Sequence, residues 1–470
     1  MRHFLLIVFI TIAINAIPFG TAHADLTPEP VVRLSIRPVA TTQPSLQYKL
    51  LPDLTDQTPG NAATLYLIGS KMGPDRKEAL ELESRASDYL DLPLEEVPRD
   101  KAEGLLGWFP SRLRMSDLAA HRQDVQWDYS LREEGVDALL PYLNDMRGLD
   151  NLWSLQTRLR TLDNDWNGAA RIIEDRLSLA RQLNHQAVEV QGLVEAGIVE
   201  ETMARGIRDW ISHGDSPNLY WSLSSLPQPF VDVHEIAVWE QSVVYFTFPI
   251  LRESKDEPSD PARWRAFLAG LPGLTGSQFP RPRNTLTNQL QVAMLAAAAQ
   301  PLARAYLLSH GHTPAQVDAM SVDQAVGTYF AEQYRRLNED AWRAWELPFW
   351  EGRADLQRQT AEVSLRQRGP GGNPLAAFVP ALERARYQFA RVDREIALLR
   401  IVEAVRDYAA RHDGSPPASL EQIKDLPVPI DPVRGQPFRY EQHGQTVTIE
   451  ALPYDEFPID GERYELTIVK

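Results

Sequence analysis

Apolar residues recur in steps of three and four along most of the chain, which is the spacing of one buried face of an α-helix. Clear examples are Leu139 to Arg160, Gly168 to Leu183 and Val188 to Ile211. The same spacing returns from Asn288 to Arg366 and from Leu382 to Ala409. The pattern therefore predicts a mainly α protein.

Two segments depart from this spacing. Residues 25–57 combine Pro and Thr with a period-two alternation at Val32, Leu34 and Ile36, which predicts an extended N-terminal arm or two edge strands. From Val233 to Ile250 the centre is rich in β-prone residues, but the apolar positions also share one helical face. We predict a helix there.

The N-terminus has the order of a secretory signal peptide. A short basic start is followed by an apolar run from Phe4 to Ile14 and by the small-x-small sequence Ala22-His23-Ala24. We expect residues 1–24 to be cleaved and the mature chain to be extracytoplasmic, either periplasmic or secreted. An uncleaved anchor is the alternative, although the apolar run is shorter than the roughly 18–20 residues of a span. The longest later run, Val292 to Ala299, is also too short, so no stable membrane insertion is expected after cleavage.

Composition limits the possible partners. The chain of 470 residues carries 48 Lys and Arg against 64 Asp and Glu, a formal net charge of −16, and it contains no Cys. Dispersed acidic charge argues against binding to nucleic acid or anionic membranes, which requires basic stripes. The absence of Cys excludes disulfides, a lipoprotein anchor and thiolate chemistry.

Composition also divides the mature chain into parts. The arm is followed by a multi-helical body at 58–368, with a charged and Gly/Pro-rich loop or hinge near 254–283. A Gly/Pro linker at 369–374 precedes a long helix and a small β-sheet at 375–470. We expect the body to be an irregular stack of helical hairpins, a TPR-like α-solenoid, because no sequence repeat recurs at a fixed period.

Three short phrases resemble uncharacterised exported helical proteins of planctomycete-type bacteria. They are Gln57 to Ala63, Pro217 to Trp221 and Ala319 to Gln324. The resemblance extends over most of the chain. It implies an exported helical protein but carries no activity.

The C-terminal part resembles the soluble domain of the major pseudopilins of type II secretion. The resemblance rests on a long helix followed by Asp431-Pro432 and then by Gly435-x-Pro437-Phe438-x-Tyr440. It implies a helix packed on a small sheet, with strands expected at Phe438–Gln442, Thr446–Ala451 and Tyr464–Val469. Pseudopilins carry this module directly behind a membrane helix, whereas a long unrelated segment precedes it here. We therefore expect a packing or docking domain rather than a pilus subunit.

One motif has the spacing of an EF-hand calcium loop. Its oxygen ligands would be Asp163, Asp165, Asn167, Glu174 and the carbonyl group of Ala169. Calcium binding requires Gly168 in a sharp turn and a second helix that begins near Ile172. The favoured interpretation is a plain turn between two helices, in which the second helix begins near Trp166 and contains Gly168.

The other candidate groups have simpler structural interpretations. His310 and His312 flank Gly311, which fits a helix end better than a zinc site, because a third ligand is missing. Trp342 and Trp345 fall on one helical face, so we expect core packing rather than a ligand groove. The sequence contains no nucleophile elbow, no Walker A loop and no zincin histidine pair. We assign no catalytic or cofactor-binding residue.

These patterns favour an exported scaffold or protein-binding protein. It would use a helical-repeat-like surface to hold another envelope or extracellular protein. The first alternative is an exported hydrolase with a site formed by dispersed acidic residues and histidines. That enzyme would need a deep pocket where carboxylates and a histidine converge with shifted pKa values. The second alternative is a calcium-stabilised structural protein.

Overall fold

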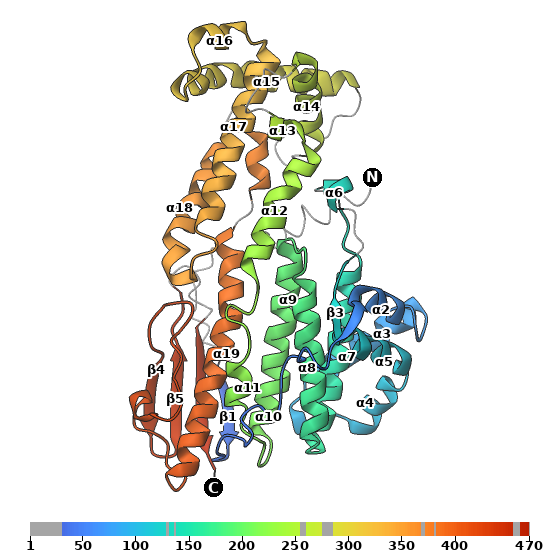
Figure 1. Ribbon diagram of the computed structural model, residues 1–470, viewed down its shortest axis with the longest axis vertical. Coiled ribbons are helices and arrows are strands. Elements are labelled where there is room, and N and C mark those ends of the chain that lie inside the picture. The colour runs from blue at the N-terminus through green and yellow to red at the C-terminus, as the bar shows by residue number, and fades with distance from the viewer. Residues whose placement is uncertain are drawn as a thin grey trace. The chain divides into compact units, whose positions relative to one another are not determined.

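The computed structural model describes residues 31–127, 131–135, 138–253, 260–274, 285–367, 372–379, 382–454 and 461–469. Helices dominate, and a four-stranded sheet includes the last strands of the chain (Figure 1). The prediction of a mainly α protein with a small C-terminal sheet is confirmed. The predicted signal peptide and residues 369–371 of the predicted linker lie outside the described residues.

Contacts divide the chain into two compact units, each built from segments that are distant in sequence. Among the described residues, the helical unit consists of those in 131–139 and 237–386. The sheet unit consists of those in 31–127, 140–236 and 387–469.

The sheet unit contains most of the short elements. Its N-terminal elements are β1 (Val31–Ile36), β2 (Thr58–Asn61), α2 (Ala62–Gly69), α3 (Arg76–Leu90), η1 (Leu94–Glu96), α4 (Arg99–Leu106), α5 (Pro110–Ala120) and β3 (Arg122–Asp124). Its central helices are α7 (Tyr142–Leu162), α8 (Trp166–Leu183), α9 (Glu189–Thr202), the π-helical η3 (Met203–Ile207), α10 (Arg208–Ser212) and α11 (Tyr220–Ser224). Its C-terminal elements are α19 (Leu382–Arg411), whose first residues belong to the helical unit, then η5 (Leu420–Gln422), β4 (Arg439–His443), β5 (Thr446–Ala451) and β6 (Glu462–Ile468).

The elements described in the helical unit are all helical. In chain order these are α6 (Leu131–Glu134), α12 (Val233–Thr247), whose first residues belong to the sheet unit, α13 (Ile250–Glu253), α14 (Pro261–Leu274), α15 (Thr285–Ser309), α16 (Pro314–Ala319), α17 (Val322–Arg343), α18 (Phe349–Gln367) and the 3₁₀ turn η4 (Pro374–Phe378). The ambiguous segment from Val233 onward is helical, as predicted. The predicted long helix from Val188 is also helical, but its centre adopts the π-helical geometry of η3.

The sheet joins the first and last strands of the described chain. β1 pairs in parallel with β6, and β6, β5 and β4 continue as an antiparallel series. Leu34 and Ile36 lie opposite Leu466 and Ile468, and all four side chains are buried. The three strands expected in the C-terminal region are confirmed, with boundaries shifted by at most two residues. The arm forms one strand, β1, and residues 37–57 contain no second one.

Charged side chains of α19 are buried together with its apolar stripe. Arg394 donates from Nε and Nη2 to the two carboxylate oxygens of Asp431, at 2.9 and 2.8 Å. Asp431 opens the turn that resembles the pseudopilin motif, and its carboxylate also accepts from the backbone N–H of Val433. Gly435 has a φ of 66°, so the turn requires a residue that tolerates the left-handed region. The ion pair thus attaches this turn to the helix.

A second set of buried charges attaches α19 to earlier segments. Glu403 accepts from Arg406 at 2.8 Å and from the backbone N–H of Leu219 at 2.9 Å. Arg406 also donates to the carbonyl groups of Ser216 and Arg37, at 2.7 and 3.1 Å. One ion pair therefore contacts both the N-terminal arm and the segment before α11.

The predicted loop or hinge near 254–283 requires a correction. Its central part forms α14, which begins at Pro261 and buries one side: Trp264, Phe267, Leu268 and Leu271. The spacing of three and four is that of a helix, and proline is favoured in the first helical turn. The sequence interpretation overlooked this short apolar stripe because charged and Gly/Pro-rich residues surround it.

The prediction that no later segment has the length and composition of a membrane span is also wrong. Within the described residues, Gln289–Ser309 of α15 is long and apolar enough by these criteria. Three Gln residues interrupt the strictly apolar run, but the segment contains only one charged residue, Arg304. Val292, Leu295, Ala299 and Ala303 are buried, and α15 packs against α14 and α17. One side of α15 therefore packs within the helical unit, while only 33 % of the apolar segment is buried.

The buried Arg394–Asp431 pair should contribute strongly to stability. We expect Arg394→Met to destabilise the protein by about 3–5 kcal/mol, because it leaves a buried carboxylate without its counter-ion. Arg439→Met, which removes the exposed partner of Glu450, should cost at most about 1 kcal/mol. Urea unfolding at neutral pH measures both values, and equal losses would contradict the assigned role of the buried pair.

Candidate functional site

The candidate site lies where the C-terminal end of α5 meets the middle of α8 in the sheet unit. Arg171, Asp175, Ser178 and Gln182 follow one another in steps of four, three and four, so they share a face of α8. Ser178 Oγ and Gln182 Nε2 donate to the carbonyl group of Ala120, whose place at the helix end leaves it without an intrahelical donor. These hydrogen bonds fix the polar face of α8 against the end of α5.

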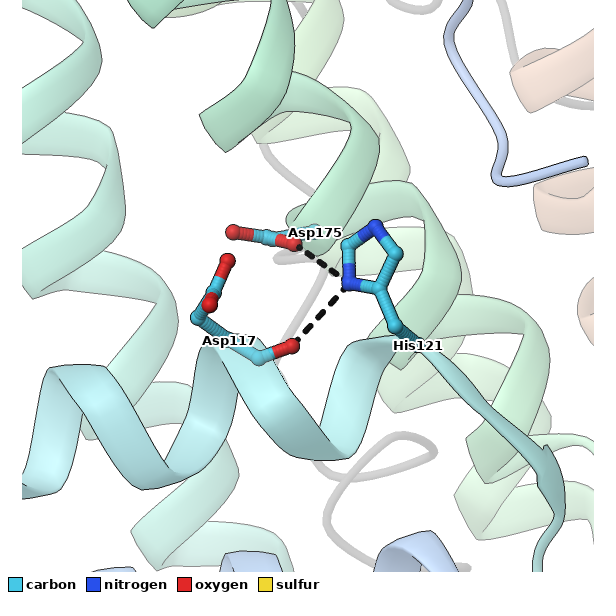
Figure 2. Close-up of side chains that lie close together, drawn as sticks. All are labelled: Asp117, His121 and Asp175. Carbon is cyan, nitrogen blue, oxygen red and sulfur yellow. Dashed lines mark hydrogen bonds and ion pairs between the residues drawn. The ribbon is translucent and has the colours of Figure 1, made fainter. Parts of the chain in front are cut away.

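His121 follows α5 and is the centre of the cluster, as Figure 2 shows. Its Nδ1 atom lies 3.0 Å from the carbonyl oxygen of Asp117 and 3.4 Å from Oδ1 of Asp175. Its Nε2 atom lies 3.8 Å from Oε2 of Glu174. The imidazole therefore has an acidic neighbour on each side. We refer to Asp117, His121, Glu174 and Asp175 as the α5–α8 cluster.

Arg171 is the basic residue beside this cluster. Its Nη2 atom lies 3.2 Å from Oδ1 of Asp117 and 3.3 Å from Nδ1 of His121. Its Nε atom is farther from Oδ1 of Asp175, at 3.9 Å. The side chains of Arg171 and Asp117 are 47 % and 41 % exposed, whereas those of His121 and Asp175 are almost fully buried. The inner residues of the cluster are thus shielded from solvent, and its outer side, beside Arg171, is accessible to solvent.

Burial and neighbouring charge shift the protonation of the inner residues. Burial raises the pKa of Asp175 well above its usual range, and the charge of Asp117 adds to this, while Arg171 opposes it. Burial alone would lower the pKa of His121, but the nearby Glu174 carboxylate and the hydrogen bond to the Asp117 carbonyl group outweigh burial, and the pKa is raised. The cluster therefore retains protons that exposed groups of the same types would lose.

Hydrogen bonding in the cluster is incomplete. Among the described residues, neither Nε2 of His121 nor Oδ1 of Asp175 has a hydrogen-bond partner, although both atoms are buried. Native proteins rarely leave buried polar atoms in this state. One donor atom each from Asp117, His121 and Asp175 lie within 4.8 Å of one another, so these three residues could hold a metal ion.

The EF-hand residues are not brought together. Asp163 pairs with Arg99, and Asp165 is the N-cap of α8, where it accepts from the backbone N–H of Gly168 at 3.0 Å. The helix α8 begins at Trp166 and contains Gly168, as the interhelical-turn interpretation predicted, whereas a calcium loop requires this helix to begin near Ile172. Glu174 faces His121 instead, further along the same helix.

The other sequence candidates form separate contacts. His312 pairs with Glu332 at 2.9 Å, while the His310 ring stacks on Tyr306. Trp342 and Trp345 are buried with ring centroids 4.9 Å apart, so the prediction of core packing is confirmed.

The sequence interpretation missed Asp117, His121 and Asp175. A usable signal existed, since Asp117/His121 and Arg171/Asp175 are both spaced by four and each pair therefore shares a helical face. The sequence does not indicate that these two faces meet. Their contact arises from the packing of α5 on α8.

A surface depression of about 500 Å³ occurs elsewhere in the sheet unit, along α3. Its lining consists of Lys77, Leu80, Glu81, Ser84 and Arg85, and no member of the α5–α8 cluster takes part. Three carboxylates and a histidine do converge, and the pKa values of Asp175 and His121 are raised. The hydrolase alternative also requires a pocket at these residues, whereas the depression described above lies along α3.

Comparisons with protein-family models, curated proteins and solved structures found no match.

The raised pKa of Asp175 gives a pH-dependent prediction. A raised carboxyl pKa means that the folded state binds the proton more tightly than the unfolded state, so stability falls as pH rises from about 4 through the folded pKa. An asparagine side chain at this position has no proton to lose. In the presence of a chelator, we expect Asp175→Asn to unfold at a higher urea concentration than wild type at pH 8 and at the same concentration at pH 4.

The charged groups that face Asp175 are Asp117, Glu174, His121 and Arg171. Asp165→Asn on the same helix is the matched control, because asparagine is also a good N-cap. This control makes the same Asp-to-Asn change on α8 outside the cluster. A pH-independent effect of Asp175→Asn would contradict the assignment.

Proposed function

We propose that this chain is an exported, non-catalytic scaffold that binds a partner protein through an apolar surface on α15. The observation that carries the proposal is the exposure of large apolar side chains along one side of this helix. Leu286, Leu290 and Met294 are 75 %, 60 % and 63 % exposed. Their spacing of four places them on one face.

This surface is unusual for its lack of charge as well as for its exposure. The sequence from Thr285 to Ala303 contains no ionisable side chain. The opposite side of α15 is already occupied, because Val292 and Leu295 are buried in the helical unit. A helix that is apolar all round normally has partners on all sides. We therefore expect the exposed side of α15 to pack against an apolar surface of a partner protein.

The chemistry of the surface favours a protein over the surface of an anionic membrane. Helices that lie on membranes carry Lys and Arg beside their apolar face, to engage anionic headgroups. The helix α15 has Arg304 as its only basic residue, and the whole chain has a net charge of −16. We infer a partner with an apolar, uncharged helical face, and the predicted signal peptide suggests that it is an envelope or extracellular protein.

The helical packing supports the scaffold interpretation. Helices that follow one another in sequence, α7 with α8 and α8 with α9, pack together as hairpins in the sheet unit (Figure 1). Such packing is the building principle of TPR-like and α-solenoid proteins, which commonly bind other proteins. It supports an irregular helical-hairpin body.

The exported hydrolase is the second candidate, and the α5–α8 cluster favours it. The cluster brings a histidine and three carboxylates together, but His121 and Asp175 are buried behind Asp117 and Arg171. A molecular substrate could reach only the two outer residues. A hydrolase screen of wild type against Asp117→Asn distinguishes this candidate, since a non-catalytic scaffold gives no activity that depends on Asp117.

Crosslinking tests the scaffold proposal. A photoreactive residue at position 290 of the mature chain, in the native envelope, should give one discrete adduct with a protein. The same residue at position 365 should not, because Leu365 is 69 % exposed on α18 and lies outside the α15 surface. Met294→Glu should weaken binding of the identified partner to the purified chain at least tenfold, since it places a charge in an apolar contact.

Three results would overturn the proposal. They are no adduct at position 290, an adduct with lipid, or an adduct with a second copy of the chain. Equal crosslinking at positions 290 and 365 would also show that exposure alone determines the product. Circular dichroism of each variant confirms that the helical content is retained.

A further inference from the structure

The α5–α8 cluster has features that a role in folding does not explain. Its inner residues, His121 and Asp175, are 5 % and 2 % exposed, and each has a buried polar atom without a hydrogen-bond partner among the described residues. Buried polar groups cost stability unless they are hydrogen-bonded or bind an ion. These two residues meet in the same small space between α5 and α8.

The contacts of Nδ1 of His121 also conflict with one another. This atom lies 3.0 Å from the carbonyl oxygen of Asp117, to which it can only donate, and 3.3 Å from Nη2 of Arg171, from which it can only accept. A neutral imidazole nitrogen cannot do both. Arg171 is half exposed and donates to Asp117 from Nε and Nη2, but it approaches Asp175 no closer than 3.9 Å.

We propose that Asp117, His121 and Asp175 form a binding site for a divalent transition-metal ion, with Zn²⁺ as the best-fitting ion, and that Arg171 occupies its position in the metal-free protein. The site is independent of the partner-binding surface on α15. Zn²⁺ suits a set of one imidazole nitrogen and two carboxylates, whereas Ca²⁺ and Mg²⁺ prefer oxygen ligands alone.

One of the distances between ligand atoms agrees with a tetrahedral ion, and all three lie within 4.8 Å. Ligand atoms about 2.0–2.2 Å from such an ion lie roughly 3.3–3.6 Å from one another. Nδ1 of His121 and Oδ1 of Asp175 are 3.4 Å apart. The exposed side of the cluster, beside Asp117 and Arg171, gives the ion a path from solvent and leaves a position for water.

Glu174 supports this geometry. When Nδ1 binds the metal, the proton of the imidazole resides on Nε2, which faces Oε2 of Glu174 at 3.8 Å. Metal-binding histidines usually donate their other N–H group to a carboxylate or a carbonyl group, which orients the ring. Glu174 is thus assigned as a positioning residue, whose carboxylate has to move closer to Nε2 to accept this hydrogen bond.

Arg171 makes the site testable. Its guanidinium group must leave before the ion enters, so Arg171→Gln should bind Zn²⁺ more tightly than wild type, by roughly tenfold or more. Asp117→Asn, an exposed change that should not disturb folding, and His121→Ala should each weaken binding at least tenfold. Glu174→Gln should weaken it roughly tenfold through the orientation of the imidazole.

The experiment uses the mature chain after treatment with a chelator. Calorimetric titration with Zn²⁺ gives stoichiometry and affinity, and Co²⁺ substitution gives the visible absorption of a four-coordinate nitrogen and oxygen site. We expect one ion per chain, and the thermal midpoint should rise with Zn²⁺ in wild type but not in Asp117→Asn. The double change His310→Gln and His312→Gln, which removes two surface histidines, should leave binding unchanged.

Three outcomes would overturn the proposal. Wild type and Arg171→Gln could both fail to bind, Asp117→Asn could bind as tightly as wild type, or the His310/His312 change could abolish binding. Loss of binding in His121→Ala counts as support only where circular dichroism shows that this variant is folded.

Discussion

The sheet unit depends on the neutralisation of charges that α19 carries into its interior. Arg394, Glu403 and Arg406 are at most 2 % exposed, and an unpaired charge at such a position costs several kcal/mol. Their partners come from the turn at Asp431, from the segment before α11 and from the N-terminal arm. Because these segments are far apart in sequence, the unit requires all three at once. The parallel pairing of β1 with β6 likewise requires the N-terminal arm and the last strand to come together to complete the sheet.

The limits of sequence prediction follow from this constraint. The spacing of apolar residues predicted α19 and the three C-terminal strands within two residues, because periodicity is a local property. The burial of its charged residues was not predicted, since Glu403 and Arg406 have partners up to 184 and 369 residues away in sequence. The pseudopilin-like order identified the turn at Asp431, but not the arginine that binds it. The N-terminal arm was likewise predicted as extended, while its partner strand could not be inferred.

The candidate site shows the same limit on a smaller scale. The sequence drew attention to the EF-hand spacing that ends at Glu174, and Glu174 does belong to the α5–α8 cluster. Its neighbours there are His121 and Arg171, whereas Asp163 and Asp165 make their contacts elsewhere, with Arg99 and the N-terminus of α8. A capping aspartate and a buried glutamate happen to fall at the spacing of a calcium loop. The sequence alone does not distinguish these two roles, because the role of Glu174 depends on how α5 packs on α8.

Arg394 and Arg171 both lie beside buried carboxylates, but they bind them differently. Arg394 is buried with Asp431 and binds both of its oxygens, which is the geometry that makes an internal ion pair favourable. Arg171 is half exposed, shares one oxygen of Asp117 and reaches Asp175 only distantly. A half-exposed cation of this kind contributes little to stability. Burying His121 and Asp175 behind it lowers the stability of the metal-free fold, and a bound divalent ion would offset that loss because it binds the folded state alone.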